Sequence, residues 1–233
     1  MESIPSTVTA ERKQISMSGE VIRKGIHLAS LTIPIAYSFF TQQTMLLILI
    51  PFTAIALFLD YGRHYAKWVR TFVNSMFASI LREHETDSKK KLLSGGSYVL
   101  ISACLCIIVF PKVIAITAFA ILIVSDAISA LLGRRFGKHK FLDKSVEGST
   151  AFFLSALIVV SIAPKASGLG AEYVIGTIGA FVGTLIEAAS VRLKVDDNFS
   201  VPCSIGIVMW LAYYLISVIG DPVYSSVFEK LMK

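Results

Sequence analysis

Seven apolar stretches alternate with polar or charged segments along the chain, a pattern typical of helices that cross a membrane. The stretches are residues 26–40, 45–59, 95–110, 113–132, 149–163, 173–191 and 201–219. The first two are shorter than the roughly 20 residues of a perpendicular span. They must therefore use flanking polar residues or pack as a short hairpin. The pattern predicts an all-α, polytopic membrane bundle of about seven transmembrane helices.

Residues 60–94 show a different pattern, in which apolar residues recur at alternating steps of three and one. They are Tyr65, Trp68, Val69, Phe72, Val73, Met76, Phe77 and Ile80, and Arg63, Lys67, Arg70 and Asn74 fall mostly on the opposite side. This spacing predicts an amphipathic helix along the cytoplasmic membrane surface. Packing against neighbouring spans is the competing interpretation. The segment 84–97 is polar and glycine-ended, which indicates a loop.

Composition agrees with a membrane protein. The chain has 233 residues, of which 55% are hydrophobic, and its mean hydropathy is +0.70. We expect a polar N-terminal segment over 1–22, one membrane-embedded catalytic domain over 23–220 and a short tail over 221–233. The first 20 residues lack an apolar core beside their charges, so no cleaved signal peptide is expected.

The net charge of +6 is distributed unevenly. Of the 22 lysines and arginines, 18 fall in the N-terminal segment and in the segments 60–94, 133–148 and 191–200. This alternation follows the positive-inside rule and predicts that the N-terminus and these loops are cytoplasmic, with the C-terminus outside. It also argues against a nucleic-acid partner, because the cations form no DNA-binding face.

The chemistry concentrates in residues 124–149, where an apolar run ends in a cluster of charges. Asp126 lies within apolar sequence, and Ser129 and Gly133 share its helical face. Five cations then follow, interrupted by glycines and followed by Glu147. They are Arg134, Arg135, Lys138, Lys140 and Lys144. A carboxylate facing such a loop suits Mg²⁺ and a polyphosphate. A positive-inside loop alone would explain the cations but not Asp126, Glu147 or the glycines.

Residues 173–191 carry a second signal. Gly176, Gly179, Gly183, Glu187 and Ser190 share one face, and small residues at this spacing let helices approach closely, within one chain or between two. The following Asp196, Asp197 and Asn198 offer oxygen ligands for a hard cation, or form a solvated turn.

The segment SDAISALLGRRFGKHKFLDKSVEGS, the RK before His27 and the DDNFSVP near the end together resemble the CTP-dependent lipid kinases. That family includes dolichol kinase, phytol kinase and CTP-using diacylglycerol kinase, and the resemblance covers about residues 23–202. The related CTP:phosphatidate cytidylyltransferases typically carry a K-D followed by a PGHGG-type segment, where this chain has DDNFSVPCS. They also usually carry Ser-Pro before Lys-Thr, which is missing here, so the kinases match better. Ser125 stands where relatives often have glycine.

The resemblance implies transfer of the γ-phosphate of CTP to a membrane lipid alcohol such as polyprenol, dolichol, phytol or diacylglycerol. We expect Asp126, Lys144 and Glu147 to be catalytic, with Asp126 either holding Mg²⁺ or accepting the hydroxyl proton. The residues expected to contact the nucleotide are Arg23, Lys24, Gly133, Arg134, Arg135, Gly137, Lys138 and Ser145. Those expected to hold Mg²⁺ are Asp126, Asp196, Asp197 and Asn198.

Two alternatives remain at this point. A cytidylyltransferase would release pyrophosphate and make a CDP-lipid, whereas a non-enzymatic transporter would use Asp126 and Glu187 as protonatable or cation-binding groups. The sequence contains no Walker-type loop, which argues against a P-loop kinase. His27 could be a proton shuttle or a hydrogen-bonded structural residue. The choice of alcohol and the oligomeric state stay open.

Overall fold

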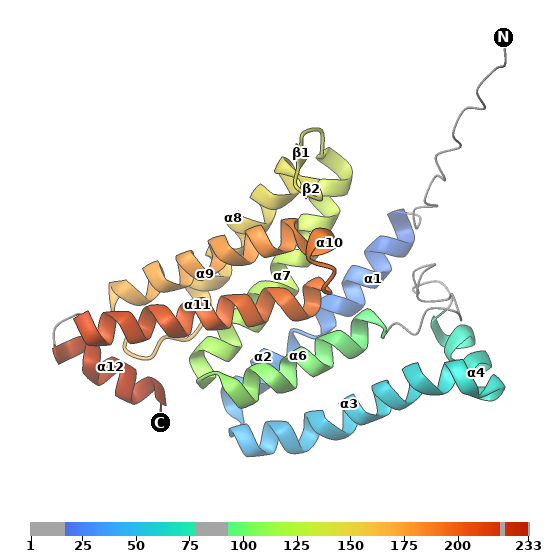
Figure 1. The fold of residues 1–233 in the computed structure, drawn as a ribbon, viewed down its shortest axis with the longest axis horizontal. Coiled ribbons are helices and arrows are strands. Elements are labelled where there is room, and N and C mark those ends of the chain that lie inside the picture. The colour runs from blue at the N-terminus through green and yellow to red at the C-terminus, as the bar shows by residue number, and fades with distance from the viewer. Residues whose placement is uncertain (1–16, 78–92, 220–221, 233) are drawn as a thin grey trace, which may run out of the picture.

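The computed structural model describes residues 17–77, 93–219 and 222–232, and it shows a helical bundle with one small hairpin (Figure 1). Ile80 and most of the predicted loop 84–97 lie outside these ranges. The elements are α1 (Met17–Ala29), α2 (Thr32–Phe39), α3 (Gln42–Tyr65), α4 (Lys67–Phe77), α6 (Gly95–Val109), α7 (Lys112–Phe136), β1 (Lys140–Phe141), β2 (Lys144–Ser145), α8 (Val146–Ile162), α9 (Gly170–Ala188), α10 (Ser190–Leu193), α11 (Asp197–Ile219) and α12 (Pro222–Met232).

Helix α7 forms the centre of the bundle. It packs most extensively against α8, and it also contacts α1, α2, α6, α9 and α11. Ile114, Ile121, Leu122 and Ile123 lose all exposure there, because the middle of α7 is apolar on every side. A helix that is apolar all round is stable only when it is surrounded. The position of Asp126 within α7 therefore places that carboxylate in the interior.

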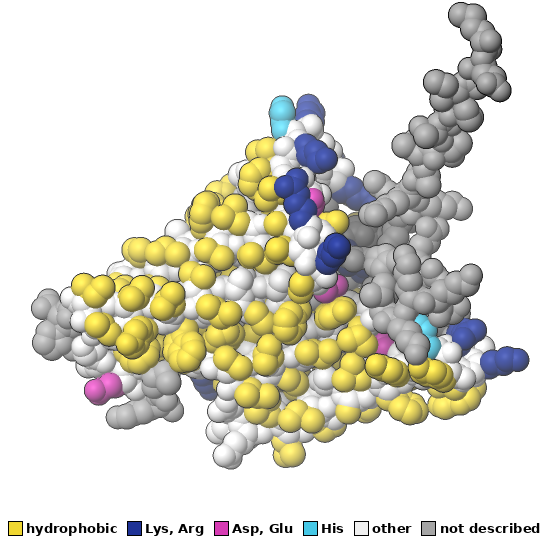
Figure 2. Space-filling view, viewed as in Figure 1, with side chains coloured by type: hydrophobic (Ala, Val, Ile, Leu, Met, Phe, Trp, Pro, Cys, Tyr) yellow, Lys and Arg dark blue, Asp and Glu magenta, His cyan; other side chains and the backbone are white. Residues whose placement is uncertain are grey.

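Among the described residues, four helices are long and apolar enough to cross a membrane, namely α3, α7, α9 and α11, and α6 and α8 are apolar but shorter. Figure 2 shows hydrophobic side chains spread over this face of the bundle, with Lys and Arg gathered around the hairpin end and near α4. The all-α class is confirmed apart from the two-residue strands, and the bundle is consistent with a membrane protein. The count of seven spans stays a prediction.

The first predicted span, 26–40, is not one continuous helix. Helix α1 ends at Ala29 and α2 begins at Thr32. Pro34 explains the break, since its ring would clash with the carbonyl of Ser30 in an uninterrupted α-helix. Tighter bonds from the amides of Ser30 and Leu31 to His27 and Leu28, each 3.0 Å long, close the turn instead.

The predicted amphipathic segment begins later than expected, because α3 continues to Tyr65. Asp60 is buried in α3 and accepts hydrogen bonds from the Ser94 amide (2.7 Å) and the Ser97 hydroxyl (2.6 Å). A guanidinium nitrogen of Arg63 lies 3.6 Å from the same carboxylate. The prediction that Arg63 lies on the polar side of a surface helix is therefore wrong. Its charge is buried at the end of α3, where Asp60 compensates it.

Helix α4 has features of a membrane-surface helix and of a helix packed against its neighbours. Val69 and Val73 are buried, and Val69 lies against Gly62 of α3. Trp68 and Phe72, on the other edge of the apolar face, are 67% and 48% exposed. One edge of α4 thus packs on the bundle, while the other presents aromatic side chains as a membrane-surface helix would.

The glycine stripe of α9 packs within the chain. A Cβ added at Gly176 would lie 2.6 Å from Val160 of α8, and one added at Gly183 would lie 2.6 Å from Ile205 of α11. The stripe lets α9 approach α8 and α11 closely, so these glycines pack helices within one chain rather than between two. Glu187 ends the stripe in the interior, with no exposure.

The end of the bundle opposite the hairpin is held together by a buried acid and by the C-terminal helix. Glu172, placed just before the predicted span 173–191, is buried and accepts hydrogen bonds from the Ala166 and Gly168 amides and the Tyr213 hydroxyl (2.7, 2.8 and 2.8 Å). The predicted tail 221–233 contains helix α12, whose Val227 and Leu231 join the hydrophobic core. The C-terminal segment is thus part of the bundle.

We predict that Gly176→Ala lowers the free energy of unfolding by about 1–3 kcal/mol, because its methyl group would overlap the stiff, β-branched Val160. Thermal denaturation in detergent measures this change. Gly170→Ala is the matched control, since a Cβ at Gly170 meets no atom within 4 Å. Equal stability of both variants would contradict close packing of α9 on α8.

Candidate active site

Asp126 and Lys24 form a buried ion pair between α7 and α1. The Lys24 ammonium donates a hydrogen bond to the Asp126 carboxylate, and the two residues are only 2% and 3% exposed. Two charges away from water are tolerated when each compensates the other. Lys24 was predicted to contact the nucleotide. In the structure its ammonium is the ion-pair partner of the Asp126 carboxylate.

His27 lies one turn after Lys24 on the same face of α1. Its Nε2 is 3.5 Å from the Asp126 carboxylate, and its side chain is 9% exposed. The carboxylate thus faces an ammonium and an imidazole from one helix. The sequence suggested His27 as either a shuttle or a structural residue, and the structure brings it to the predicted catalytic acid.

A second charge cluster joins the hairpin to α9 and α11. Nζ of Lys144 lies 2.9 Å from Glu187 and 3.7 Å from Asp197. Ser129, one turn after Asp126 in α7, donates a hydrogen bond of 3.3 Å to Glu187. Glu187 was absent from the predicted site residues, although an acid within an apolar helix was a visible signal of function.

The acids hold Lys144 in its charged form. Burial alone would lower the pKa of the Lys144 ammonium, but Glu187, Asp197 and Asp126 raise it, and the net effect is a raised pKa. The interactions between Lys144 and these acids stabilise the folded protein at any pH below the pKa that Lys144 has in the unfolded state. This stabilisation is lost only as pH rises through the higher pKa of the folded state. Lys144 is therefore a permanent cation at neutral pH, suited to binding anions rather than to moving protons.

The hairpin that carries Lys144 is fixed to α9 and α10. Lys140 pairs with Ser145 and Phe141 with Lys144 across an antiparallel ladder. The Asp143 amide donates to the carbonyl of Ala188 (3.0 Å), and the Asp143 carboxylate accepts from the amide and Nε of Arg192 (2.8 and 3.0 Å). These bonds hold Lys144 beside Glu187.

The predicted glycines pack helix α7 against α8 and the hairpin. A Cβ at Gly133 would lie 3.1 Å from the Cα of Gly148, and one at Gly137 would lie 2.7 Å from Oγ of Ser145. The Gly137 amide is already bonded to the carbonyl of Gly133, and Ser145 caps α8 by accepting from the Gly148 amide at 3.1 Å. The geometry shows a packing role for these residues, and their contact with a nucleotide stays a prediction.

The side chain of Glu147 bonds to His139, and these bonds do not connect it to either charge cluster. Its carboxylate accepts from the His139 amide (3.3 Å) and lies 2.8 Å from Nδ1 of His139. Its own backbone amide and the His139 ring lower the pKa of Glu147 to about 2. It stays ionised at neutral pH, and any stability from this ionised form is lost only as pH falls from about 4.5 toward 2. This geometry favours a structural role at the start of α8.

The remaining predicted cations are exposed at the same end. Arg134 and Arg135 lie in the last turn of α7, and Lys138 follows in the loop before β1. Figure 2 shows Lys and Arg side chains gathered at this end of the bundle, where the Lys144 side chain is also partly exposed. Such a surface can contact a polyphosphate without burying unpaired charge.

The predicted metal residues do not form one cage. Asp126 pairs with Lys24, Asp197 lies near Lys144, and Asp196 accepts bonds from the amide and side chain of Asn198 (3.0 and 2.8 Å). Within residues 17–77, 93–219 and 222–232, no three His, Cys, Asp or Glu side chains gather to hold a metal ion. Mg²⁺, however, commonly uses one or two carboxylates together with waters and substrate phosphates, which this donor set allows.

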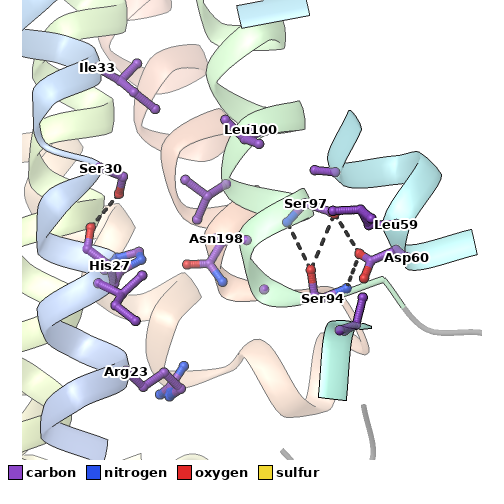
Figure 3. A pocket seen from close by; sticks show the side chains of 16 residues that line it. Arg23, His27, Ser30, Ile33, Leu59, Asp60, Ser94, Ser97, Leu100 and Asn198 are labelled. Carbon is purple, nitrogen blue, oxygen red and sulfur yellow. Dashed lines mark hydrogen bonds between the residues drawn. The ribbon is translucent and has the colours of Figure 1, made fainter. Parts of the chain in front are cut away.

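Arg23 points to a cavity beside the charge clusters. The cavity has a volume of about 390 Å³ and lies between α1, α3, α4, α6 and α11 (Figure 3). His27 and Asn198 line it as well. Arg23 was predicted to bind nucleotide together with Lys24, but adjacent residues on a helix diverge, and only Lys24 is paired with Asp126.

We predict that Lys24→Met lowers the free energy of unfolding by about 3–5 kcal/mol, because the buried Asp126 carboxylate loses its cation. Adding Asp126→Asn should restore much of this loss, since neither charge then remains. Thermal denaturation of both single variants and the double variant in detergent measures the coupling. Strictly additive losses would contradict the buried pair.

The chain has homologues among known proteins. No protein-family model matches it, and no solved structure matches it. It is 35% identical over 182 residues to an uncharacterized protein of Rickettsia prowazekii, covering 78% of this chain and 89% of that protein. It is 27% identical over 220 residues to a probable chloroplastic phytol kinase of Triticum aestivum, covering 87% of this chain and 70% of that protein. A probable phytol kinase 2 of Glycine max is 30% identical over 167 residues, 65% of this chain and 56% of that protein. The chain belongs to the family of the Rickettsia protein and is a distant homologue of proteins named phytol kinase, which supports a phytol kinase-like lipid kinase family.

Proposed function

We propose that the protein is a CTP-dependent lipid-alcohol kinase, which transfers the γ-phosphate of CTP to the hydroxyl of a membrane lipid alcohol. One observation carries the proposal. Two charge clusters, the buried Asp126–Lys24–His27 and the partly buried Lys144–Glu187–Asp197, lie in an apolar bundle that has a cation-rich end and whose distant homologues are named phytol kinase. A kinase for lipid alcohols needs this combination of an apolar body and a charged end.

The nucleotide triphosphate would bind at the hairpin end. Protein groups in phosphoryl transfer mainly position the phosphates and neutralise their charge. Lys144 remains charged, and Arg134, Arg135 and Lys138 are exposed between the end of α7 and the hairpin that carries Lys144. We assign these four cations to the triphosphate. The charged loops would face the cytoplasm, where a nucleotide is accessible.

Mg²⁺ would be held by Asp197 with help from Asn198, whereas the carboxylate of Asp126 is occupied by Lys24 and His27. Asp197 suits this role because its side chain is 14% exposed and its charge is only partly compensated by Lys144 at 3.7 Å. When bound, Mg²⁺ neutralises charge on the phosphates. The carboxylate of Asp196 is committed to Asn198, which makes it a supporting residue.

Asp126 and His27 would receive the hydroxyl proton. The alcohol oxygen forms a bond to the γ-phosphorus, and the bond from that phosphorus to the bridging oxygen of CDP breaks. CDP leaves with the bonding electrons, and the hydroxyl proton passes to the Asp126–His27 pair. The close contact between the carboxylate and the imidazole supports this role, since a base must lie within reach of the proton that it takes.

The geometry gives less support to a transporter. Asp126 and Glu187 are each paired with a lysine. A carrier would need acids that are available to exchange a proton or a cation. A cytidylyltransferase would use the same nucleotide but a phosphatidic acid acceptor, so product analysis separates the two enzymes.

We predict that the purified protein transfers label from γ-labelled CTP to geranylgeraniol or phytol in the presence of Mg²⁺, and that Asp126→Asn lowers the rate roughly 100-fold or more. Asn keeps the shape and an acceptor oxygen for Lys24, so this variant separates charge from packing. Thin-layer chromatography of the lipid product measures the transfer. Wild-type rates in Asp126→Asn would remove Asp126 from the mechanism.

We also predict that Arg135→Gln combined with Lys138→Gln raises the KM for CTP about tenfold, since each loses a charge-assisted contact with phosphate. Steady-state kinetics with CTP as the varied substrate measures the change. Lys112→Gln is the matched control, because Lys112 is a cation at the opposite end of α7. A similar effect of both variants would contradict phosphate binding at the hairpin end.

A further inference from the structure

The cavity between α1, α3, α4, α6 and α11 has a mostly apolar surface, although seven polar or charged side chains also line it. Ile26 and Ile33 line it from the first two helices, Leu59 from α3, and Val99 and Leu100 from α6 (Figure 3). Its volume of about 390 Å³ lies within the range of small-molecule sites, about 300–1,000 Å³. Helix α3 is long and apolar enough to cross a membrane, so this wall belongs to the membrane-embedded part of the bundle.

The polar groups on the α3 and α6 side of the cavity are already satisfied by one another. Asp60 accepts from the Ser94 amide and the Ser97 hydroxyl, and Ser94 and Ser97 are joined as well (Figure 3). These bonds fix the wall and use the hydroxyl protons of both serines. A polar group of a ligand that needs a side-chain donor would therefore bind on the opposite wall, which α1 and α11 form.

His27 connects that opposite wall to the charged site. It lines the cavity, while its Nε2 lies 3.5 Å from the Asp126 carboxylate. Nε2 is buried and has no hydrogen-bond partner among the described residues. Asp126 itself does not line the cavity, so His27 is the side chain through which a molecule in the cavity would reach the carboxylate.

The chemistry of the cavity differs from that of the hairpin end. The cations assigned to the triphosphate lie on the hairpin and on the last turn of α7, whereas the cavity has apolar walls with Arg23 as its one lining cation among the described residues. A nucleotide would leave most of its phosphate charge uncompensated there. An alkyl or isoprenoid chain with one hydroxyl matches both the walls and His27.

We propose that this cavity binds the hydroxyl-bearing end of the acceptor alcohol, with its chain against α3 and α6 and its hydroxyl hydrogen-bonded to His27. The inference rests on the proposed function and deepens it, because it separates an acceptor site from the nucleotide site. His27 then takes the hydroxyl proton as the oxygen attacks the γ-phosphorus and CDP leaves, with Asp126 stabilising the imidazolium. The two substrates reach Asp126 from different sides.

A photoreactive alcohol tests the cavity directly. The full-length protein in detergent is irradiated with a diazirine analogue of geranylgeraniol, and labelled peptides are identified by mass spectrometry. We expect labelling on α1, α3 or α6, and loss of labelling when unmodified geranylgeraniol competes. Labelling that falls only on other helices, or that does not respond to competition, would overturn the proposal.

Leu100→Trp provides the matched kinetic test, because the indole would fill the cavity from α6. We expect it to raise the KM for the alcohol at least tenfold and leave the KM for CTP within twofold. Leu47→Trp is the control, since Leu47 is 76% exposed on α3 and does not line the cavity. Ile33→Phe, on the opposite wall, serves if Leu100→Trp is not folded. An unchanged alcohol KM in a folded variant would overturn the proposal.

His27→Gln tests the second part of the assignment. The Gln amide can still donate to Asp126 but cannot take a proton, so kcat should fall at least tenfold with stability and cavity labelling retained. Loss of stability with unchanged kcat per folded molecule would overturn this role. Failure of the proposed function would give a different result. If the wild-type protein is labelled in the cavity but transfers no phosphate, the kinase function is refuted and the alcohol site is not.

Discussion

The burial of the Asp126 carboxylate is the constraint on which the charged site depends. A lone carboxylate inside an apolar helix is costly, and the fold compensates it with Lys24 and His27 from α1, about a hundred residues earlier in the chain. This requirement fixes the face that α1 presents to α7. One turn further along α7, Ser129 contacts Glu187, so the same helix also organises the second cluster. The two clusters therefore share one rigid support.

Close packing keeps that support rigid. The glycines of α9 bring it against α8 and α11, and Gly133 meets Gly148 where α7 meets α8. The hairpin leaves α7 and returns into α8 at this contact, while Asp143 ties it to Arg192. Lys144 is thus held beside Glu187 by backbone geometry rather than by a flexible surface loop. A site built on fixed helices can position phosphates more accurately than one on mobile segments.

The fold class and the position of an acid inside an apolar helix could be predicted because their signals are local. Apolar runs of the right length, Asp126 within one of them and glycines at helical spacing are all visible in the sequence. The pairing of Lys24 with Asp126 and of Lys144 with Glu187 could not be predicted, because it depends on how distant helices dock. The same holds for Arg63, whose burial depends on Asp60 and on the start of α6. Glu147 and the glycines matched a motif, yet in the structure Glu147 contacts His139, and Gly133 and Gly148 pack against each other.

Two substrates are proposed to meet at Asp126, with a nucleotide reaching it from the hairpin end and an alcohol through His27. The stoichiometry of products tests this when the purified protein is given Mg²⁺, CTP and a single lipid alcohol. We expect one CDP for each lipid phosphate formed and no CDP without the alcohol. Release of pyrophosphate with phosphatidic acid as acceptor, or no nucleotide turnover with any alcohol, would contradict it.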